Sequence, residues 1–267
     1  MATQTHTSLF DTHYPVIIAP MFLVSNVAMM KGAADNGISG SFPALNYRTD
    51  RDFRAAIDEI RAYSNKPFGV NLIVNKSNVK YKSQLETCLE KKVDYIITSL
   101  GNPKECIDRC KPLGIKVFCD VTDLKYAKKV EELGADAVIA VNSVAGGHAG
   151  NIPPEELIPM LKKELSIPII SAGGVSNSED IKKMLSLGAT AVSVGTIFIA
   201  SEEAGVSDDY KNALVEYGQK DIVRTTKMSG SALTVINTPY VQTIGTEAGF
   251  LEKLMHRNKW LKKYIKM

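Results

Sequence analysis

The sequence has no apolar segment long enough to cross a bilayer, no low-complexity stretch and no composition break that would mark a linker. Residues 1–12 are polar and lack the basic-then-apolar order of a secretory signal, so we expect a cytoplasmic protein. These absences exclude membrane-spanning, fibrous and disordered classes. A length of 267 residues suits one large α/β domain or two small ones, and 45% apolar with 23% charged residues allows a substantial core. Because no composition break marks a linker, we predict a single domain over residues 1–267.

Cysteine is scarce, and the four cysteines all lie between residues 88 and 119. Cys106 and Cys110 would share a helix face, but their spacing is not Cys-x-x-Cys and no histidine lies nearby in the sequence. Reduced structural thiols are therefore expected at Cys88, Cys106, Cys110 and Cys119, and no metal site.

Acidic residues are rare at the end of the chain, where residues 251–267 carry six Lys/Arg against Glu252. Such a tail suits nucleic acid or membrane binding. Apolar residues nevertheless recur among the charges at helical spacing, which favours a helix packed on its own domain. We therefore predict neither a nucleic-acid nor a membrane partner. The apolar positions are Phe250, Leu251, Leu254, Trp260, Leu261 and Tyr264.

The chain also lacks the Gly-x-Gly-x-x-Gly turn that a dinucleotide-binding sheet places after its first strand. It contains instead eight short apolar segments, each followed by a helical pattern, as expected of a (β/α)8 TIM barrel. Residues 1–14 would be an N-terminal extension, and residues 219–267 a helical tail packed on the barrel. The expected strands are 15–19, 37–40, 68–74, 94–98, 115–119, 137–141, 168–171 and 190–194. The expected helices are 26–36, one from Asp50, 80–91, 103–110, 124–133, 155–165, 178–187 and 208–217.

Histidine is equally rare, and His148 is the only one away from the chain ends. It follows the sixth expected strand in a turn with Gly146, Gly147 and Gly150. A lone histidine in a loop is usually a solvated polar residue. The carboxyl ends of barrel strands, however, are where this architecture places its chemistry, so His148 is our candidate catalytic residue.

Two further glycine turns follow the seventh and eighth expected strands, at Gly173–Gly174 and at Gly195. In a barrel these neighbouring loops form the usual phosphate-binding site, because glycine lets backbone N–H groups approach phosphate oxygens. Thr196 adds a hydroxyl. The two turns together predict a phosphate site.

Five motifs resemble those of nitronate monooxygenases, formerly called 2-nitropropane dioxygenases, and of the related flavin-dependent type II enoyl-acyl-carrier-protein reductases. The resemblance extends from about residue 15 to about residue 205 and implies a TIM barrel with non-covalently bound FMN. The motifs are Ala19–Met21, Pro67–Leu72, Ala145–Gly150, Ile169–Val175 and Leu187–Thr196.

The resemblance also assigns roles to individual residues. It implies that the FMN phosphate binds at Gly173, Gly174, Gly195 and Thr196. Ala19, Pro20 and Met21 would lie against the flavin ring, Asn71 would contact FMN, and Gly147 and Ala172 would complete the cofactor contacts. His148 matches the catalytic histidine of the family.

Two positions depart from the family pattern. Val144 stands where relatives often carry a glutamate, and Val141 stands where they tend to have a polar side chain. We expect Asn142 to supply the missing flavin hydrogen bond from the next position.

The resemblance implies oxidation of alkyl nitronates or nitroalkanes with O2 to a carbonyl compound and nitrite. His148 would act either as an imidazolium that stabilises negative charge or as a base that removes an α-proton. The main alternative is an NAD(P)H-dependent reductase acting on an enoyl thioester or quinone. A flavin-binding module without turnover is less favoured because FMN binding alone does not require His148. The natural substrate and the choice between monomer and homodimer stay open.

Overall fold

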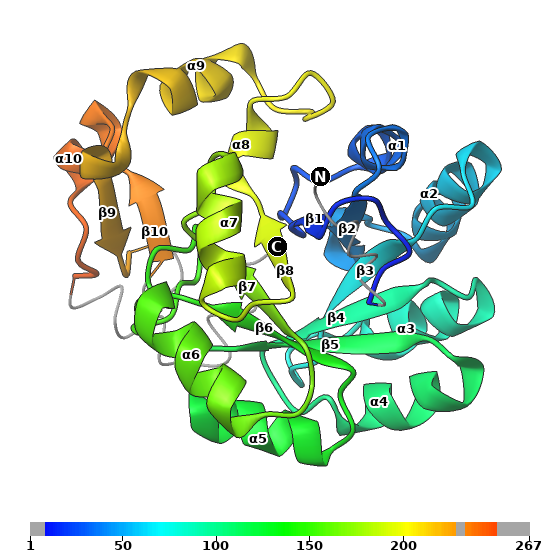
Figure 1. The fold of residues 1–267 in the computed structure, drawn as a ribbon. Helices are drawn as coiled ribbons and strands as arrows, with labels where there is room; N and C mark the ends of the chain where they lie inside the picture. Colours follow the sequence, from blue (N-terminus) through cyan, green and yellow to red (C-terminus); the bar gives the residue numbers. More distant parts are fainter. Residues whose placement is uncertain (1–8, 228–232, 250–267) are drawn as a thin grey trace.

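The computed structural model describes residues 9–227 and 233–249, and these form a closed barrel of eight parallel strands in sequential order (Figure 1). The (β/α)8 barrel predicted from the sequence is thereby confirmed. The barrel strands are β1 (Val16–Ile18), β2 (Ser39–Pro43), β3 (Phe68–Ile73), β4 (Tyr95–Ser99), β5 (Lys116–Val121), β6 (Ala137–Val141), β7 (Ile169–Ala172) and β8 (Ala191–Val194).

Helices connect the strands and pack around the outside of the barrel. Several begin where a polar side chain accepts a hydrogen bond from a backbone N–H of the first turn, as with Asn26, Thr49, Asp123 and Asn177. The helices are α1 (Val27–Asp35), α2 (Asp50–Tyr63), α3 (Tyr81–Glu90), α4 (Lys104–Cys110), α5 (Leu124–Glu132), α6 (Pro154–Glu164), α7 (Ser178–Ser186), α8 (Thr196–Ile199), α9 (Asp208–Glu216) and α10 (Pro239–Ile244).

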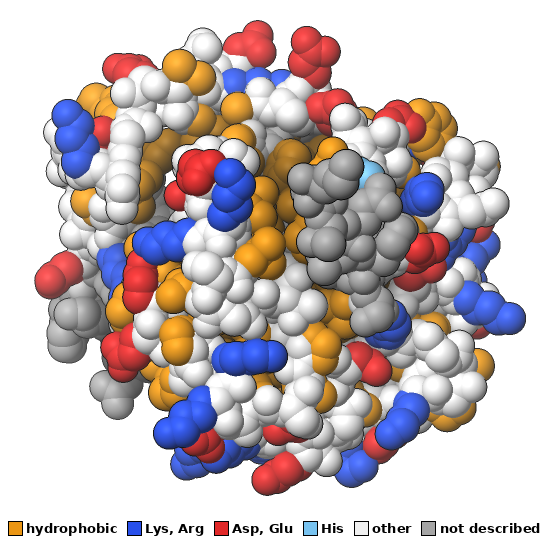
Figure 2. All heavy atoms as spheres, in the orientation of Figure 1, with side chains coloured by type: hydrophobic (Ala, Val, Ile, Leu, Met, Phe, Trp, Pro, Cys, Tyr) orange, Lys and Arg blue, Asp and Glu red, His pale blue; other side chains and the backbone are white. Residues whose placement is uncertain are grey.

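The outer surface of the helical layer carries acidic and basic side chains side by side, as Figure 2 shows. Lys128 of α5 pairs with Glu164 of α6 at 2.6 Å, and Lys183 of α7 pairs with Glu155 of α6 at 2.6 Å. Exposed pairs of this kind contribute little stability each, so the fold depends on its buried core. No helix among residues 9–227 and 233–249 is long and apolar enough to span a membrane.

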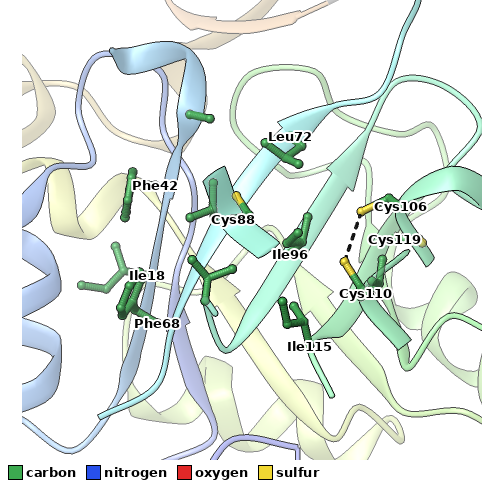
Figure 3. Close-up of a cluster of buried hydrophobic side chains, with 14 of the residues drawn as sticks. Ile18, Phe42, Phe68, Leu72, Cys88, Ile96, Cys106, Cys110, Ile115 and Cys119 are labelled. Atoms are coloured by element: carbon green, nitrogen blue, oxygen red, sulfur yellow. Dashed lines mark hydrogen bonds between the residues drawn. The ribbon is translucent and has the colours of Figure 1, made fainter. Parts of the chain in front are cut away.

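The space between the sheet and the helices contains the four cysteines, which are buried and free (Figure 3). Cys106 and Cys110 lie one turn apart on α4 with their sulfur atoms 3.9 Å apart. Burial raises the pKa of Cys88 and Cys119, which keeps both as thiols. The expected structural thiols are confirmed.

The barrel interior is filled from the amino-terminal end by aromatic side chains. Phe10, in the described part of the N-terminal extension, packs on Tyr95 and Phe118 with ring centroids 5.8 and 5.6 Å apart. Tyr95 fits because β3 has Gly69 opposite it, where a Cβ atom would lie 2.0 Å from the ring. The extension therefore plugs one end of the barrel, and the carboxyl end is left for a site.

The segment after the barrel differs in part from the expected helical tail. Strands β9 (Ile222–Thr225) and β10 (Leu233–Ile236) form an antiparallel pair, and α10 follows them. The sequence analysis did not predict this pair, because each strand is only four residues long and partly exposed. The helix expected from Phe250 onward lies outside the described residues.

Candidate functional site

The predicted phosphate site lies at the carboxyl ends of β7 and β8, which are hydrogen-bonded neighbours with Ala172 paired to Ser193. Gly173 and Gly174 follow β7 with φ angles of +111° and +76°, a region that favours glycine. Gly195 follows β8 and precedes α8. The backbone N–H of Gly174 and the hydroxyl of Thr196 donate to no described residue, so both are available to donate a hydrogen bond to an anion. The structure thus brings both glycine turns together.

The turn that carries His148 packs directly on these two loops. A Cβ atom on Gly173 would lie 2.4 Å from Asn142 Oδ1, and one on Gly174 would lie 2.7 Å from Val144 Cγ2. On Gly146 it would lie 3.5 Å from Thr196 Oγ1. Glycine at 173 is therefore needed for the approach of two loops as well as for any ligand.

Asn142 organises the turn from inside. It is fully buried, its Nδ2 donates to Gly173 O at 3.0 Å, and its Oδ1 accepts from Val144 N at 3.0 Å. Its backbone oxygen accepts from the N–H groups of Ala145 and Gly150. These bonds hold the loops after β6 and β7 together. The sequence analysis expected a flavin hydrogen bond from Asn142; the structure gives its side chain this internal function.

His148 is exposed on this organised turn, one residue after Gly147, whose φ is +68°. At the base of the turn, a Cβ atom on Gly150 would lie 2.4 Å from Val141 O, so the loop closes tightly there. The imidazole is therefore presented to solvent at the mouth of the barrel by a backbone that is held at both ends.

The β9–β10 pair holds the same turn from outside. Thr234 Oγ1 donates to Ala145 O at 2.7 Å, and Thr234 N donates to Gly147 O at 2.8 Å. Arg224 donates to Gly150 O, to Ser143 O at 3.2 Å and to Asn151 Oδ1 at 2.9 Å. Sequence analysis missed Arg224 and Thr234 because nothing local links them to a loop more than 70 positions away.

On the opposite side of the mouth, three polar side chains form a chain of hydrogen bonds across β3, β4 and β5. Asn71 Nδ2 donates to Ser99 Oγ at 2.7 Å, and Ser99 Oγ donates to Asp120 Oδ2 at 2.5 Å. Asp120 was not among the sequence-predicted residues, because the expected fifth strand ended at Cys119 whereas β5 continues to Val121.

The segment Ala19–Met21 crosses the mouth beside Gly195. Ala19 N donates to Val194 O at 2.8 Å, and a Cβ atom on Gly195 would lie 3.4 Å from the sulfur of Met21. Ser25 fixes this segment by donating to Ala19 O and accepting from Met21 N, both at 2.9 Å. The predicted site residues of β1, β6, β7 and β8 therefore gather at one face of the mouth.

Comparison with known proteins identifies the family. The family model for nitronate monooxygenase matches residues 76–266. The chain belongs to the nitronate monooxygenase family. It is similar, with 27% identity over 283 residues, to a probable nitronate monooxygenase of Staphylococcus haemolyticus, covering 89% of this chain and 79% of that protein. As a member of this family, it is an enzyme, a flavoprotein oxidoreductase.

Two other relatives have different names. A (3aS,4S,5R,7aS)-5-hydroxy-7a-methyl-1-oxo-octahydro-1H-indene-4-carboxyl-CoA dehydrogenase of Rhodococcus jostii is 29% identical over 238 residues, covering 89% of this chain and 67% of that protein. The structure of FabK from Thermotoga maritima superimposes with a TM-score of 0.85 at 29% identity, over 99% of this chain and 81% of that chain. FabK is an enoyl-acyl-carrier-protein reductase II. The resemblance to the type II enoyl-acyl-carrier-protein reductases is therefore confirmed as well.

The site of this nitronate monooxygenase family member fits a flavin nucleotide. Gly174 and Thr196 offer an N–H and a hydroxyl to a phosphate, and the first turn of α8 is at the same place. Across the mouth, Asn71 and Asp120 are the polar side chains that could contact the other end of such a ligand. In the described residues no group of three His, Cys, Asp or Glu side chains is arranged to hold a metal ion.

Asp120 has a shifted pKa. Burial raises the pKa of its carboxyl group from 3.8 to about 6, and the hydrogen bond from Ser99 opposes that shift. Because the folded state holds the proton more tightly than the unfolded chain, the free energy of unfolding falls as the pH rises from about 4 to about 6.

We therefore expect Asp120→Asn to stabilise the flavin-free protein at pH 7–8 by at most about 3 kcal/mol relative to wild type. The difference should shrink as the pH falls toward 4 and vanish below about pH 3, where both the folded and the unfolded carboxyl groups are protonated. Urea unfolding of both proteins at pH 4 to 8 measures it. A difference that does not change with pH would contradict the assignment.

We expect Arg224→Ala to loosen the His148 turn, because a hydrogen bond that involves a charged group contributes about 1.5–3 kcal/mol, and Arg224 makes one such bond to the partly buried Gly150 O. Amide hydrogen exchange at residues 143–150 should become faster by on the order of tenfold or more. Arg51→Ala, which removes an exposed arginine on α2, is the matched control. Equal exchange rates in the two variants would show that Arg224 does not hold the turn.

Proposed function

We propose that this protein is an FMN-dependent nitronate monooxygenase that oxidises alkyl nitronates with O2 to a carbonyl compound and nitrite. The observation that carries the proposal is the packing of the His148 turn on the phosphate-binding loops, with Val144 against Gly174 and Gly146 beside Thr196. A titratable side chain and an anion site thus share one barrel mouth.

In this proposal the FMN phosphate binds at Gly173, Gly174, Gly195 and Thr196. Ala19, Pro20, Met21 and Asn71 contact the ring, and Gly147 and Ala172 complete the site. Asn142 acts through the loops that it joins. Bound FMN supplies the electron acceptor, and the protein supplies orientation and charge.

His148 has two roles available in this reaction. As an imidazolium it stabilises the negative charge of a nitronate, which is already an anion. As a neutral imidazole it removes the α-proton of a nitroalkane. Its exposed position at the mouth lets it exchange protons with solvent between turnovers.

A second candidate is an NAD(P)H-dependent reductase of an enoyl thioester or a quinone. The observation that favours it is a set of exposed apolar side chains on the loops after β1, β4 and β6 and on α8, which suits a substrate with an apolar body. These side chains are Phe22, Leu23, Leu100, Val144 and Ile197. The likeness to FabK supports the same candidate.

One experiment separates the two candidates. The purified protein is mixed without oxygen with NADH, NADPH or propionate 3-nitronate, and the flavin absorbance is followed. Rapid bleaching by the nitronate alone supports the monooxygenase, and rapid bleaching by NADH or NADPH alone supports the reductase. Purified protein that holds no flavin and takes up no added FMN would contradict both.

A further inference from the structure

The hydrogen-bonded chain Asn71–Ser99–Asp120 faces the inside of the barrel. Side chains alternate along a strand, so Asp120 lies on the same side of β5 as Phe118, which belongs to the core inside the barrel. Ser99 likewise shares a side of β4 with Ile97. Asp120 is therefore on the floor of the mouth, one layer above the aromatic and aliphatic core.

This floor lies across the barrel from the phosphate-binding loops. In a closed ring of eight strands, β3 and β4 are opposite β7 and β8. A flavin nucleotide with its phosphate at Gly174 and Thr196 would have β3, β4 and β5 on the other side of the mouth, where its ring could lie. This step rests on the cofactor of the proposed function.

We propose that Asp120, seated by Ser99, faces the ring of the bound flavin and takes up a proton when negative charge accumulates on that ring. The proton comes from solvent and forms the O–H bond of a neutral carboxyl group, which can then donate a hydrogen bond to the ring. The electrons come from the substrate. Asp120 is thus a positioning and charge-balancing residue for the flavin rather than a second base for the substrate.

The surroundings of Asp120 suit this exchange. It forms no ion pair with a described residue, unlike Asp50 and Glu86, each of which pairs with an arginine. Its titratable neighbours are the thiol of Cys119 on β5 and the phenol of Tyr126 on α5, whose pKa values are both raised. Both are neutral near pH 7, so no nearby charge holds Asp120 in its ionised form.

One oxygen of the Asp120 carboxyl group is available for a second hydrogen bond. Ser99 occupies Oδ2, and Oδ1 accepts no hydrogen bond from a described residue. Since burial already raises the pKa of Asp120 to about 6, an added negative charge at the mouth raises it further. Reduction of the flavin would then be accompanied by uptake of one proton at Asp120, in addition to the protons taken up by the ring itself.

The test is the pH dependence of the two-electron midpoint potential of the bound flavin, measured by spectroelectrochemistry between pH 5 and 8.5. Wild type should show a break near pH 6, and one extra proton per two electrons should be taken up from there until the pH reaches the higher pKa that Asp120 has beside the reduced ring. Asp120→Asn keeps the size of the side chain and removes its titration, so this break should be absent. Glu132→Gln, which removes an exposed carboxylate from the neighbouring helix α5, should keep it.

Ser99→Ala supplies an independent check. The hydrogen bond from Ser99 lowers the pKa of Asp120, so its loss should move the break to higher pH. Bound flavin with the same pH profile in wild type and Asp120→Asn would overturn this inference alone. Protein that binds no flavin would overturn the proposed function and this inference with it.

Discussion

We expect His148→Ala to lower turnover by about 10²–10⁴-fold while the flavin stays bound, the usual range for loss of a positioned acid or base. The backbone of the turn is held by Asn142 from inside and by Arg224 and Thr234 from outside, so removal of the exposed imidazole leaves its frame in place. A fall in activity would then report the chemistry of the side chain.

Matched nitroalkane and nitronate pairs separate the two roles of His148. Oxygen consumption that falls only with neutral nitroalkanes means proton abstraction, and a fall with both substrates means charge stabilisation or positioning. His13→Ala is the control, because His13 precedes β1 at the other end of the barrel and packs on Tyr14. Unchanged rates of His148→Ala on every substrate, NAD(P)H-driven reduction included, would contradict the catalytic assignment.

The second large effect is expected from Gly174→Asp, which should remove the flavin. The new carboxylate and the phosphate are two like charges, which repel by ~4 kcal/mol at a separation of about 4 Å and a surface-like dielectric. That energy corresponds to a loss of roughly a thousandfold in affinity for the flavin. The structure adds a steric cause, since a Cβ atom at position 174 would lie 2.7 Å from Val144 Cγ2 and the φ angle there is +76°. Flavin content after purification and titration with FMN measure the loss.

Two variants separate the charge from the backbone strain. Gly114→Asp introduces the same side chain at a glycine with φ +71° and open space around it, at the amino-terminal side of β5. It should keep its flavin. Gly174→Ala brings the strain without the charge and should lose less affinity than Gly174→Asp. If Gly174→Asp keeps a full complement of flavin, the phosphate does not bind at this turn.

Much of the fold followed from local patterns. The alternation of apolar strands and helical patterns depends only on neighbouring residues. The sequence pointed to Asp50 as the cap of the second helix, and in the structure the cap is Thr49, one residue earlier, with Asp50 in the first turn of α2. Strand ends were predicted less well, because hydrogen bonding to adjacent strands decides them. Strand β5 thus continues through Asp120, which pairs with Ile139 of β6, and places that carboxyl inside the barrel.

The sequence by itself determined the barrel, the free thiols and the placement of Gly174, Thr196 and His148 at strand ends, because regular βα units put those ends on one rim. Only the tertiary structure decided the contacts that shape the site. Arg224 reaches Gly150 across 74 positions, and Ser99 reaches Asp120 from the neighbouring strand. Such contacts depend on loop packing and on the depth of each side chain in the barrel, since burial and partners set both the direction of a hydrogen bond and the pKa of a carboxyl group.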